Sequence, residues 1–409
     1  MNCRFCKTPL EHVFVDLGHQ PPSNAYLTKE QLQLPEVYYP LRVRVCNNCW
    51  LVQTEDYADR TAFFSHDYAY FSSTSSSWLQ HASNYSTMIT QKLELNKNSF
   101  VVEIASNDGY LLKNFLAAGI PCLGIEPTDS TADAAEAIGI NVQRDFFGET
   151  LATKLATEGK QADLIIGNNV YAHVPDILDF TNGMSVLLKP QGVITLEFPH
   201  IMRLVEYNQF DTIYHEHYSY LSLTAVISIF ESVGLRIFDV EELTTHGGSL
   251  RVYGCLKNAD YKELNSIKVL VEEETKRGMS SIPFYSGFQK KVEQIKIDLL
   301  EFLITAKKEK KSVLAYGAAA TGNTLLNFAG VKSDMIEFVA DANLYKQGKF
   351  MPGSHIPIFE PEIISKQSFD YCLILPWNIK EEVIKQLTYV RNCDYKFVIC
   401  IPQFQIIQF

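Results

Sequence analysis

The sequence at residues 100–109 is FVVEIASNDG, an apolar, β-branched run that ends in small and polar residues. Its first five residues are typical of a buried strand, and Tyr110 opens a segment with helical spacing. A strand that leads through such a loop into a helix brings the backbone and the helix N-terminal amides close to a ligand. Residues 100–109 therefore predict the first βα unit of an α/β domain, with a cofactor site at the loop.

Comparable apolar runs recur along the chain and predict two sheets. The first sheet is expected to take its strands from residues 100–104, 121–126, 163–166 and 192–198, and the second from residues 312–316, 336–340, 371–375 and 396–401. Segments with helical spacing separate these runs, which is the pattern of parallel βαβ units. The fold class is therefore α/β, with parallel sheets covered by helices on both faces.

The chain is expected to divide into three parts. Residues 1–65 are irregular and turn-rich, residues 66–258 hold the first sheet, and residues 259–409 hold the second. The third part begins with a charged connector at residues 261–311, in which apolar side chains recur at Phe288, Val292, Ile295, Leu299 and Phe302. This spacing predicts one or two long helices that join the lobes and carry their charges on a solvated face.

The composition favours a globular enzyme over other classes of protein. The 409 residues are 46% hydrophobic and 20% charged, which is typical of a folded chain. The net charge of -11 argues against a nucleic-acid partner, which clustered Lys and Arg would bind. No apolar run reaches membrane-spanning length, so no membrane partner is expected. Because Cys3 and Cys6 occupy the place of a signal peptide, we expect a cytoplasmic protein.

Two C-x-x-C pairs lie near the two ends of the first part: Cys3 with Cys6, and Cys46 with Cys49. A two-residue spacer lets both thiolates of a pair bind one ion, and two pairs complete a tetrahedral site. A redox motif needs only one pair, so the duplication disfavours that alternative and a chance pairing. Four thiolates leave no open position on the metal. The sequence therefore predicts a structural zinc ion.

The cofactor site is expected where the strands of the first sheet end. In chain order its residues are Glu103, Ala105, Ser106, Asn107, Asp108, Gly109, Glu126, Pro127, Asp145, Phe146, Asn168 and Asn169. Glu126 is placed to bind ribose hydroxyls, residues 145–146 to meet the adenine, and residues 168–169 to face the reacting centre. Ala105 and Asn107 stand where a dinucleotide site has Gly. This departure is easier to accept for S-adenosylmethionine, which has no pyrophosphate, than for NAD.

The densest cluster of titratable and aromatic side chains is FDTIYHEHYSY at residues 210–220. His215 and His217, two residues apart in an extended or loop segment, are expected to point the same way and to form a base or a ligand pair. Histidine abstracts protons near neutral pH, and the adjacent carboxylate of Glu216 is placed to fix its tautomer. The alternative is a packed aromatic strand in which both histidines make structural hydrogen bonds.

Three other segments carry candidate site residues. His173 lies just past residues 168–169 and is expected near the transferred group. The stretch His246-Gly247-Gly248-Ser249 is a flexible turn suited to the close approach of a substrate. Tyr68 and Tyr70 begin an aromatic and serine-rich run that is expected to form a substrate lid. The alternatives are a helix start at His173, a hairpin turn at residues 246–249 and a surface loop at residues 68–77.

Together these motifs resemble the C-methyltransferases of deoxysugar biosynthesis, which modify dTDP- or GDP-linked 4-keto-6-deoxysugars. The resemblance covers the whole chain in the family's order: the two cysteine pairs, Tyr68-x-Tyr70-x-Ser-Ser, EIASNDG at 103–109, GIEP at 124–127, Asn168-Asn169 with His173, FDTIYHEH at 210–217, HGGS at 246–249 and YGAAATGN at 316–323. The family implies a zinc-binding lobe, a class I S-adenosylmethionine-dependent methyltransferase domain with a Rossmann-like fold, and a C-terminal Rossmann-like domain without its own dinucleotide.

The resemblance also implies a chemistry for this chain. His217 is expected to remove a proton beside the C4 ketone of the sugar, and the resulting carbanion attacks the sulfonium methyl group. Tyr214 and Glu216 are expected to orient the base and the sugar or to stabilise the enolate oxygen. His173, Tyr70 and Tyr68 line the same cavity in this account. The zinc ion is expected to lie far from the chemistry.

The turn at residues 317–323 follows a strand of the second sheet, so its amides are expected to hold the substrate's nucleotide or diphosphate. The candidate substrate-binding residues are Gly317, Ala318, Thr321 and Asn323, with Lys346 after the next strand. The alternative is that this part is a scaffold whose glycines serve its turns. The expected partner is a dTDP- or GDP-linked keto-deoxysugar, bound by a monomer or a weak homodimer.

Three rival functions follow from the same sequence. The first is an O-methyltransferase that uses the same histidine on a sugar hydroxyl, which differs from the C-methyltransferase in needing no adjacent ketone. The second is a non-catalytic module whose zinc site recruits a partner; the acidic charge disfavours it, and a failure to bind S-adenosylmethionine would favour it. The third is a dehydrogenase, which the two missing glycines disfavour.

Overall fold

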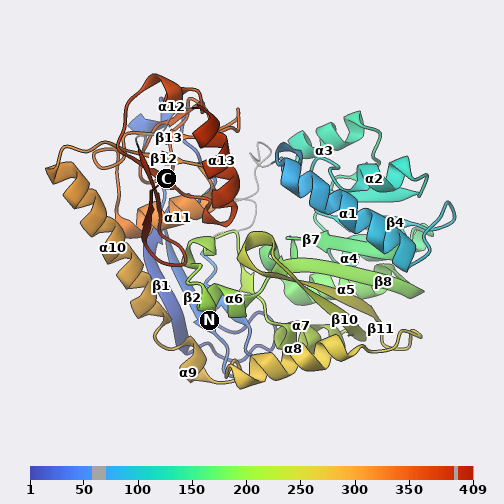
Figure 1. The fold of residues 1–409 in the computed structure, drawn as a ribbon. Helices are drawn as coiled ribbons and strands as arrows, with labels where there is room; N and C mark the ends of the chain where they lie inside the picture. The colour runs from blue at the N-terminus through green and yellow to red at the C-terminus, as the bar shows by residue number, and fades with distance from the viewer. Residues whose placement is uncertain (58–70, 391–394, 409) are drawn as a thin grey trace.

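The computed structural model describes residues 1–57, 71–390 and 395–408, and its strands form three sheets (Figure 1). The strand orders are β1-β2-β3-β9, β10-β11-β8-β7-β4-β5-β6 and β14-β13-β12-β15-β16-β17. Helices cover the second and third sheets, so the expected α/β class with two sheet-and-helix parts is confirmed.

The first sheet is antiparallel and belongs mainly to the N-terminal part of the chain. Its strands are β1 (His12–Gln20), β2 (Tyr39–Val45), β3 (Val52–Thr54) and β9 (Ser219–Tyr220). The last strand comes from the middle of the sequence and pairs Val52 with Tyr220 and Gln53 with Ser219. The N-terminal sheet is therefore completed by the strand that directly follows the aromatic and histidine cluster at residues 210–217.

The second sheet has a parallel core extended by two antiparallel strands. Its strands are β4 (Val101–Ile104), β5 (Cys122–Ile125), β6 (Val142–Gln143), β7 (Ala162–Asn168), β8 (Leu188–Pro199), β10 (Leu235–Leu243) and β11 (Ser249–Leu256). The helices are α1 (Ser76–Lys92), α2 (Leu112–Ala117), α3 (Asp129–Ala137), α4 (Glu149–Thr157), α5 (Ile177–Leu187), α6 (Ile201–Glu206) and α7 (Leu223–Ser232). The four strands expected from the sequence pair parallel, and β11 adds antiparallel pairing with both β8 and β10.

The third sheet is parallel except at one edge. It contains β12 (Val313–Tyr316), β13 (Val339–Ala340), β14 (Ile358–Phe359), β15 (Tyr371–Ile374), β16 (Lys396–Ile399) and the antiparallel β17 (Gln405–Ile407). Its helices are α11 (Ala320–Ala329), α12 (Ile363–Lys366) and α13 (Lys380–Val390). All four strands expected from the sequence are present, although the run at 336–340 is a strand only at its last two residues.

The connector forms helices, as its spacing predicts: α8 (Asn265–Lys276), α9 (Ile282–Tyr285) and α10 (Phe288–Lys308). In α10 the buried face carries Phe288, Val292, Ile295 and Leu299, and Leu303 takes the fifth buried position instead of Phe302. The ring of Phe14 from β1 stacks on Phe288 at 4.5 Å between centroids. Helix α10 thus packs along the first sheet on its way to the third (Figure 1).

Contacts across the three parts are specific. Leu27 forms a β-bridge with Phe350, and the Tyr26 hydroxyl donates to the Ala318 carbonyl at 2.6 Å. Together with β9, these contacts interlock the N-terminal sheet with both other sheets. The division of the chain into three parts, with boundaries at residues 65 and 258, remains a proposal. Within the described ranges, every helix is too short or too polar to cross a membrane.

Candidate active site and metal centre

The four cysteines of the two C-x-x-C pairs meet at one point. The Sγ atoms of Cys3, Cys6, Cys46 and Cys49 all lie within 4.8 Å of one another, and no disulfide joins them. The Sγ atoms of Cys3 and Cys49 are 3.5 Å apart, as are those of Cys6 and Cys46. Four sulfur atoms at this spacing match the thiolate set of a closed tetrahedral zinc site. The cluster fits the structural zinc ion that the sequence predicts.

The four-cysteine cluster is connected to the histidine cluster through hydrogen bonds of strand β3. The Gln53 amide donates to Cys3 Sγ at 3.2 Å. The next residue, Thr54, donates its hydroxyl to the His217 carbonyl at 2.5 Å and its amide to the Tyr218 carbonyl at 3.1 Å. Strand β3 therefore connects a cysteine ligand to His217 within two consecutive residues.

The loop after β4 keeps the shape of a glycine-rich loop without two of its glycines. Ala105, Asn107 and Gly109 have φ angles of 56°, 50° and 75°, all in the left-handed region. Glycine enters this region freely and asparagine tolerates it, whereas alanine is strained there. The sequence pattern is weak at residues 105 and 107, yet the backbone has the nucleotide-type turn. Only the structure makes this visible.

Acidic side chains gather at the loop. The Glu126 carboxylate accepts hydrogen bonds from the amides of Asn107 at 2.9 Å and Thr128 at 3.0 Å, so it ties the end of β4 to the end of β5. Burial, together with the charges of Asp108 and Glu126, raises the pKa of Glu103 well above its usual range. The three carboxylates of Glu103, Asp108 and Glu126 repel one another, and a cationic ligand would offset this repulsion.

Several buried polar atoms at this loop and at the end of β7 have no partner among the described residues. Across the described residues, the Asp108 Oδ1, the Ser106 Oγ and both amide atoms of Asn168 make no hydrogen bond to protein. They lie at the carboxyl ends of β4 and β7, where open α/β sheets bind their ligands. Buried polar atoms ordinarily have partners, so these atoms fit a cofactor with hydroxyl and amino groups. The Asn169 amide is held by the Glu197 carbonyl at 2.7 Å.

A hollow of about 320 Å³ lies beyond β6. Asp145 and Phe146 line it, together with Lys154 and Asp179. The Asp145 carboxylate accepts the amide of Phe146 at 2.8 Å. The two residues expected near the adenine therefore stand at a cavity, and Pro127 is half-buried after β5.

The histidine cluster is a turn and not a strand. The His217 amide donates to the Tyr214 carbonyl at 2.9 Å, which places His215 and Glu216 in the middle of the turn. The expectation that His215 and His217 form a pair is therefore wrong. His215 lies against β2, with its Nε2 3.2 Å from the Pro40 carbonyl. A turn sends alternate side chains apart, whereas a strand would have kept them on one side.

The imidazole of His217 has a defined tautomer. Its Nδ1 lies 2.7 Å from the carbonyl oxygen of Thr212, an atom that only accepts, so Nδ1 carries the proton. Its Nε2 therefore accepts from the Tyr214 hydroxyl at 2.7 Å. The sequence suggested that the carboxylate of Glu216 sets this tautomer, but it does not contact the His217 ring nitrogens. It instead accepts the Asn24 amide at 2.9 and 2.8 Å.

His173 is the histidine that accompanies His217. Their ring centroids are 4.5 Å apart with the planes at 69°. Burial lowers the pKa of His173 to about 4, and burial together with the neighbouring His173 lowers the pKa of His217 well below its usual value. Both rings are therefore neutral near pH 7, as a general base must be.

We expect acidification to destabilise the protein through these buried histidines. The folded-state pKa of His173, about 4, lies below its unfolded value, so the unfolded chain binds more protons as the pH falls from about 6.5 to 4. Between pH 7 and pH 5 this costs about 2 kcal/mol for His173 alone. Urea unfolding of His173→Gln should show a smaller loss between these two pH values than the wild type. Exposed His19→Gln is the control, and an unchanged loss in His173→Gln would refute the assignment.

The turn at residues 246–249 joins β10 to β11 and is covered by protein side chains. A Cβ built on Gly247 would stand 2.4 Å from Trp377 Cη2, and one on Gly248 would stand 2.7 Å from Arg203 Cγ. The Ser249 hydroxyl donates to the Thr245 carbonyl at 3.0 Å. The expectation that these glycines admit a substrate backbone is therefore wrong. His246 faces Trp78, with ring centroids 5.3 Å apart.

Protein groups also occupy part of the space around the turn at residues 317–323, which follows β12. Asn323 is fully buried and donates to the Ser23 carbonyl at 2.7 Å, so its expected substrate contact is wrong and it ties α11 to the N-terminal part. The Ala318 amide donates to Asp341 at 2.6 Å, and its carbonyl accepts Lys346 Nζ at 2.8 Å. Gly317 lies against Pro376, whose Cδ would be 2.4 Å from an added Cβ.

Thr321 is half-buried in the first turn of α11. Lys346 lies 5.2 Å above the ring of Tyr26. These residues and Ala318 gather where the third sheet meets the N-terminal part. Tyr68 and Tyr70, the expected lid residues, lie outside the described residues.

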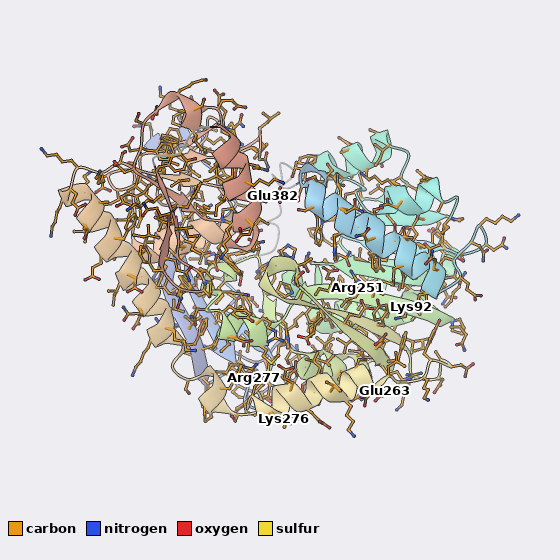
Figure 2. All side chains as sticks on the ribbon, in the orientation of Figure 1. Lys92, Arg251, Glu263, Lys276, Arg277 and Glu382 are labelled. Carbon is orange, nitrogen blue, oxygen red and sulfur yellow. The ribbon has the colours of Figure 1, made fainter. Side chains whose placement is uncertain are left out.

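A buried ionic cluster around Glu197 is absent from the sequence expectations. The Glu197 carboxylate is fully buried in β8 and contacts His81 at 2.9 Å, Arg251 at 3.0 Å and the Thr245 hydroxyl at 3.0 Å. Figure 2 labels Arg251, which lies between α1 and the sheet. The acid inside the apolar run GVITLEF at 192–198 is the signal that would have revealed it.

The cluster lies between the cofactor loop and the turn at 246–249. Although burial acts in the opposite direction, the hydrogen bond from His81 and the charges of His81 and Arg251 lower the pKa of Glu197. Through its contacts with His81 of α1 and Arg251 of β11, the buried Glu197 carboxylate of β8 connects these three elements beside residues 168–169.

Comparisons with known proteins cover the whole chain. Three family models match, described as "Putative zinc binding domain" at residues 3–64, "Methyltransferase domain" at residues 79–240 and "C-methyltransferase C-terminal domain" at residues 244–402. The C-methyltransferase NovU of Streptomyces niveus is 33% identical over 405 residues, which are 99% of this chain and 96% of that protein.

Two further similarities are partial. A ubiquinone biosynthesis O-methyltransferase of Bartonella tribocorum is 30% identical over 99 residues, 24% of this chain and 40% of that protein. The solved structure of PH0226 protein from Pyrococcus horikoshii covers 49% of this chain and 100% of its own, with 13% identity and a TM-score of 0.38.

Proposed function

Because the chain belongs to the C-methyltransferase family that includes NovU, we propose that it methylates a ring carbon, C3 or C5, of a nucleotide-linked 4-keto-6-deoxysugar. The chain is an S-adenosylmethionine-dependent methyltransferase with an N-terminal zinc-binding segment. The family resemblance drawn from its motifs is therefore confirmed. The sugar, its nucleotide and the enolate route are the proposal.

The geometry of His217 supports the proposed mechanism. With its proton on Nδ1, its Nε2 holds a lone pair and is expected to take the proton from the carbon beside the ketone. The C–H electron pair would then form the C=C bond of an enolate as the C4 carbonyl π pair moves onto oxygen. S-adenosylmethionine, when bound, would supply the methyl group: the enolate carbon takes the methyl group as the C4 carbonyl re-forms, the S–CH3 electron pair stays on the sulfur of the departing S-adenosylhomocysteine, and His217 releases its proton to solvent.

Tyr214, His173 and Glu216 have distinct proposed roles. The Tyr214 hydroxyl, now donated to His217 Nε2, is expected to turn to the enolate oxygen once the sugar occupies the site. His173 packs edge-to-face against the base, which burial keeps neutral. Glu216 acts through Asn24 and fixes the position of the turn. Tyr68 and Tyr70 remain proposed cavity residues on the family resemblance.

We assign the cofactor to the carboxyl ends of β4 and β7. Glu103, Asp108, Ser106 and Asn168 are expected to contact it, and residues 105–109 supply the turn. Glu126 and Pro127 follow β5 and are expected at the ribose. Asp145 and Phe146 are expected at the adenine, and Asn169 near the methyl group.

The nucleotide of the substrate is assigned to the junction between α11 and the N-terminal part. Gly317, Ala318 and Thr321 lie there, and Lys346 supplies a positive charge for a diphosphate. His246 contributes from the neighbouring turn. We further propose a monomer or weak homodimer that acts in the cytoplasm.

An assay with both nucleotide types tests the substrate. The purified protein is incubated with methyl-¹³C S-adenosylmethionine and either a dTDP- or a GDP-4-keto-6-deoxysugar, and the product is examined by mass spectrometry and NMR. We expect the label on a ring carbon beside the ketone. A label on oxygen would establish the O-methyltransferase alternative, which the partial similarity to an O-methyltransferase keeps open. No transfer to either sugar would refute the substrate class.

A further inference from the structure

Trp377 reaches from the third sheet into the catalytic part of the chain. It lies in a short 3-10 turn (Trp377–Ile379) after β15, and its indole Nε1 donates to Asp211 Oδ2 at 2.7 Å. The ring also lies over Gly247, where a Cβ would stand 2.4 Å from it. The half-buried side chain of Trp377 therefore contacts both the segment at residues 210–217 and the turn at residues 246–249.

Asp211 is buried and accepts this hydrogen bond from the indole. Its side chain belongs to a residue that is 1% exposed, and its Oδ1 makes no hydrogen bond in the part of the chain that the structure describes. Burial raises the pKa of Asp211 to about 7. The titratable group that faces it is the Cys400 thiol, whose own pKa is raised by burial and by Asp211. The indole is thus its one side-chain partner among the described residues.

Asp211 is one residue from the atom that fixes His217. The Thr212 carbonyl accepts the His217 Nδ1 proton at 2.7 Å. Any displacement of Asp211 therefore moves the acceptor that determines the tautomer and the direction of the imidazole.

A second contact from the same sheet reaches this segment. The Thr324 hydroxyl of α11 donates to the Ile213 carbonyl at 2.8 Å, and Phe328 packs edge-to-face on Phe210 at 5.6 Å. The residues on both sides of Thr212 are therefore bound to the C-terminal part of the chain.

We propose that Trp377 is a positioning residue for methyl transfer, which holds His217 through Asp211 and Thr212. The proposal rests on the proposed function, because it takes His217 as the base. The C-terminal part then has a role in catalysis that is independent of substrate binding, because it supports the turn that carries His217. A displacement of about 1 Å at a catalytic group can lower a rate by about a hundredfold.

Two substitutions break the Trp377 contact, and one preserves it. Trp377→Phe removes the indole N–H and keeps an aromatic ring, and Asp211→Leu removes the acceptor. Both are expected to lower kcat by about tenfold or more, while KM for the sugar and for S-adenosylmethionine stays within about twofold. Asp211→Asn keeps an acceptor oxygen for the indole and should retain most of the activity. Trp50→Phe makes the same chemical change elsewhere and should leave kcat unaltered.

A second measurement does not depend on turnover. In histidine ¹⁵N-labelled protein, the Nδ1–H signal of His217, assigned by its loss in His217→Asn, should shift or broaden in Trp377→Phe and stay unchanged in Trp50→Phe. If neither sugar is methylated, the proposed function fails, and this signal alone decides the role of Trp377.

Wild-type kcat together with an unchanged His217 signal in Trp377→Phe would overturn the proposal, as would equal losses in Asp211→Asn and Asp211→Leu. If Trp377→Phe does not fold, the comparison of Asp211→Leu with Asp211→Asn takes its place, because these two variants remove and keep the acceptor of the indole N–H.

Discussion

Replacing His217 by Asn is expected to lower the rate of methyl transfer by about 10²–10⁴-fold, the usual range for the loss of a general base. The substitution keeps an N–H group that can reach the Thr212 carbonyl but removes the lone pair at Nε2. The fold and cofactor binding should be unaffected, because the residues proposed to bind the cofactor lie at the ends of β4 and β7. Steady-state rates and calorimetric binding of S-adenosylmethionine measure the two effects separately.

The matched control is His215→Asn, the same substitution two residues away. His215 points to the carbonyls of Tyr39 and Pro40 on β2 and not to the base, so its variant should keep most of the rate. Equal losses in the two variants would mean that the turn, and not the imidazole of His217, is what the reaction needs. A near-wild-type rate in His217→Asn would remove it as the base.

Loss of the zinc ion is expected to have the second large effect. Zinc binding supplies on the order of 10 kcal/mol to small four-ligand sites, so Cys46→Ser should lose the metal and destabilise the N-terminal sheet. Because β3 connects Cys3 to the His217 carbonyl through Gln53 and Thr54, methyl transfer should fall as well. Atomic absorption reports the loss of metal, limited proteolysis and thermal unfolding report the destabilised sheet, and the steady-state rate reports the fall in methyl transfer.

The control for the zinc prediction is Cys255→Ala, which removes a buried thiol outside the four-cysteine cluster. This variant should keep its zinc and its proteolytic resistance. Full zinc content in Cys46→Ser, or unchanged proteolysis after chelation, would contradict a structural role for the metal.

Local sequence patterns predicted those features that depend on neighbouring residues. The strand FVVEI, the helical spacing in α10 and the two C-x-x-C pairs each carry their signal within a few positions, and each is present. The extension of the second sheet by β10 and β11 was missed. Both strands have the composition of buried strands, but the antiparallel pairing of β11 with β8 and of β10 with β11 is set by a turn and by tertiary packing.

The candidate site was predicted less completely, because its geometry depends on residues distant in sequence. The partner of His217 Nδ1 is a backbone carbonyl, which no side-chain pattern reveals. The sequence predicts the close approach of a substrate at Gly247, yet Trp377 Cη2 fills the space beside it. A glycine in a turn indicates that something approaches closely, and only the tertiary structure identifies it.

The most direct test of the enolate route is proton exchange without methyl transfer. The protein is incubated in deuterated water with the keto-deoxysugar and S-adenosylhomocysteine, and the ring proton beside the C4 ketone is followed by NMR. The account predicts that this proton is replaced by deuterium in the wild type and retained in His217→Asn. Retention of the proton by a wild-type enzyme that still transfers methyl groups from S-adenosylmethionine would contradict a base-generated enolate.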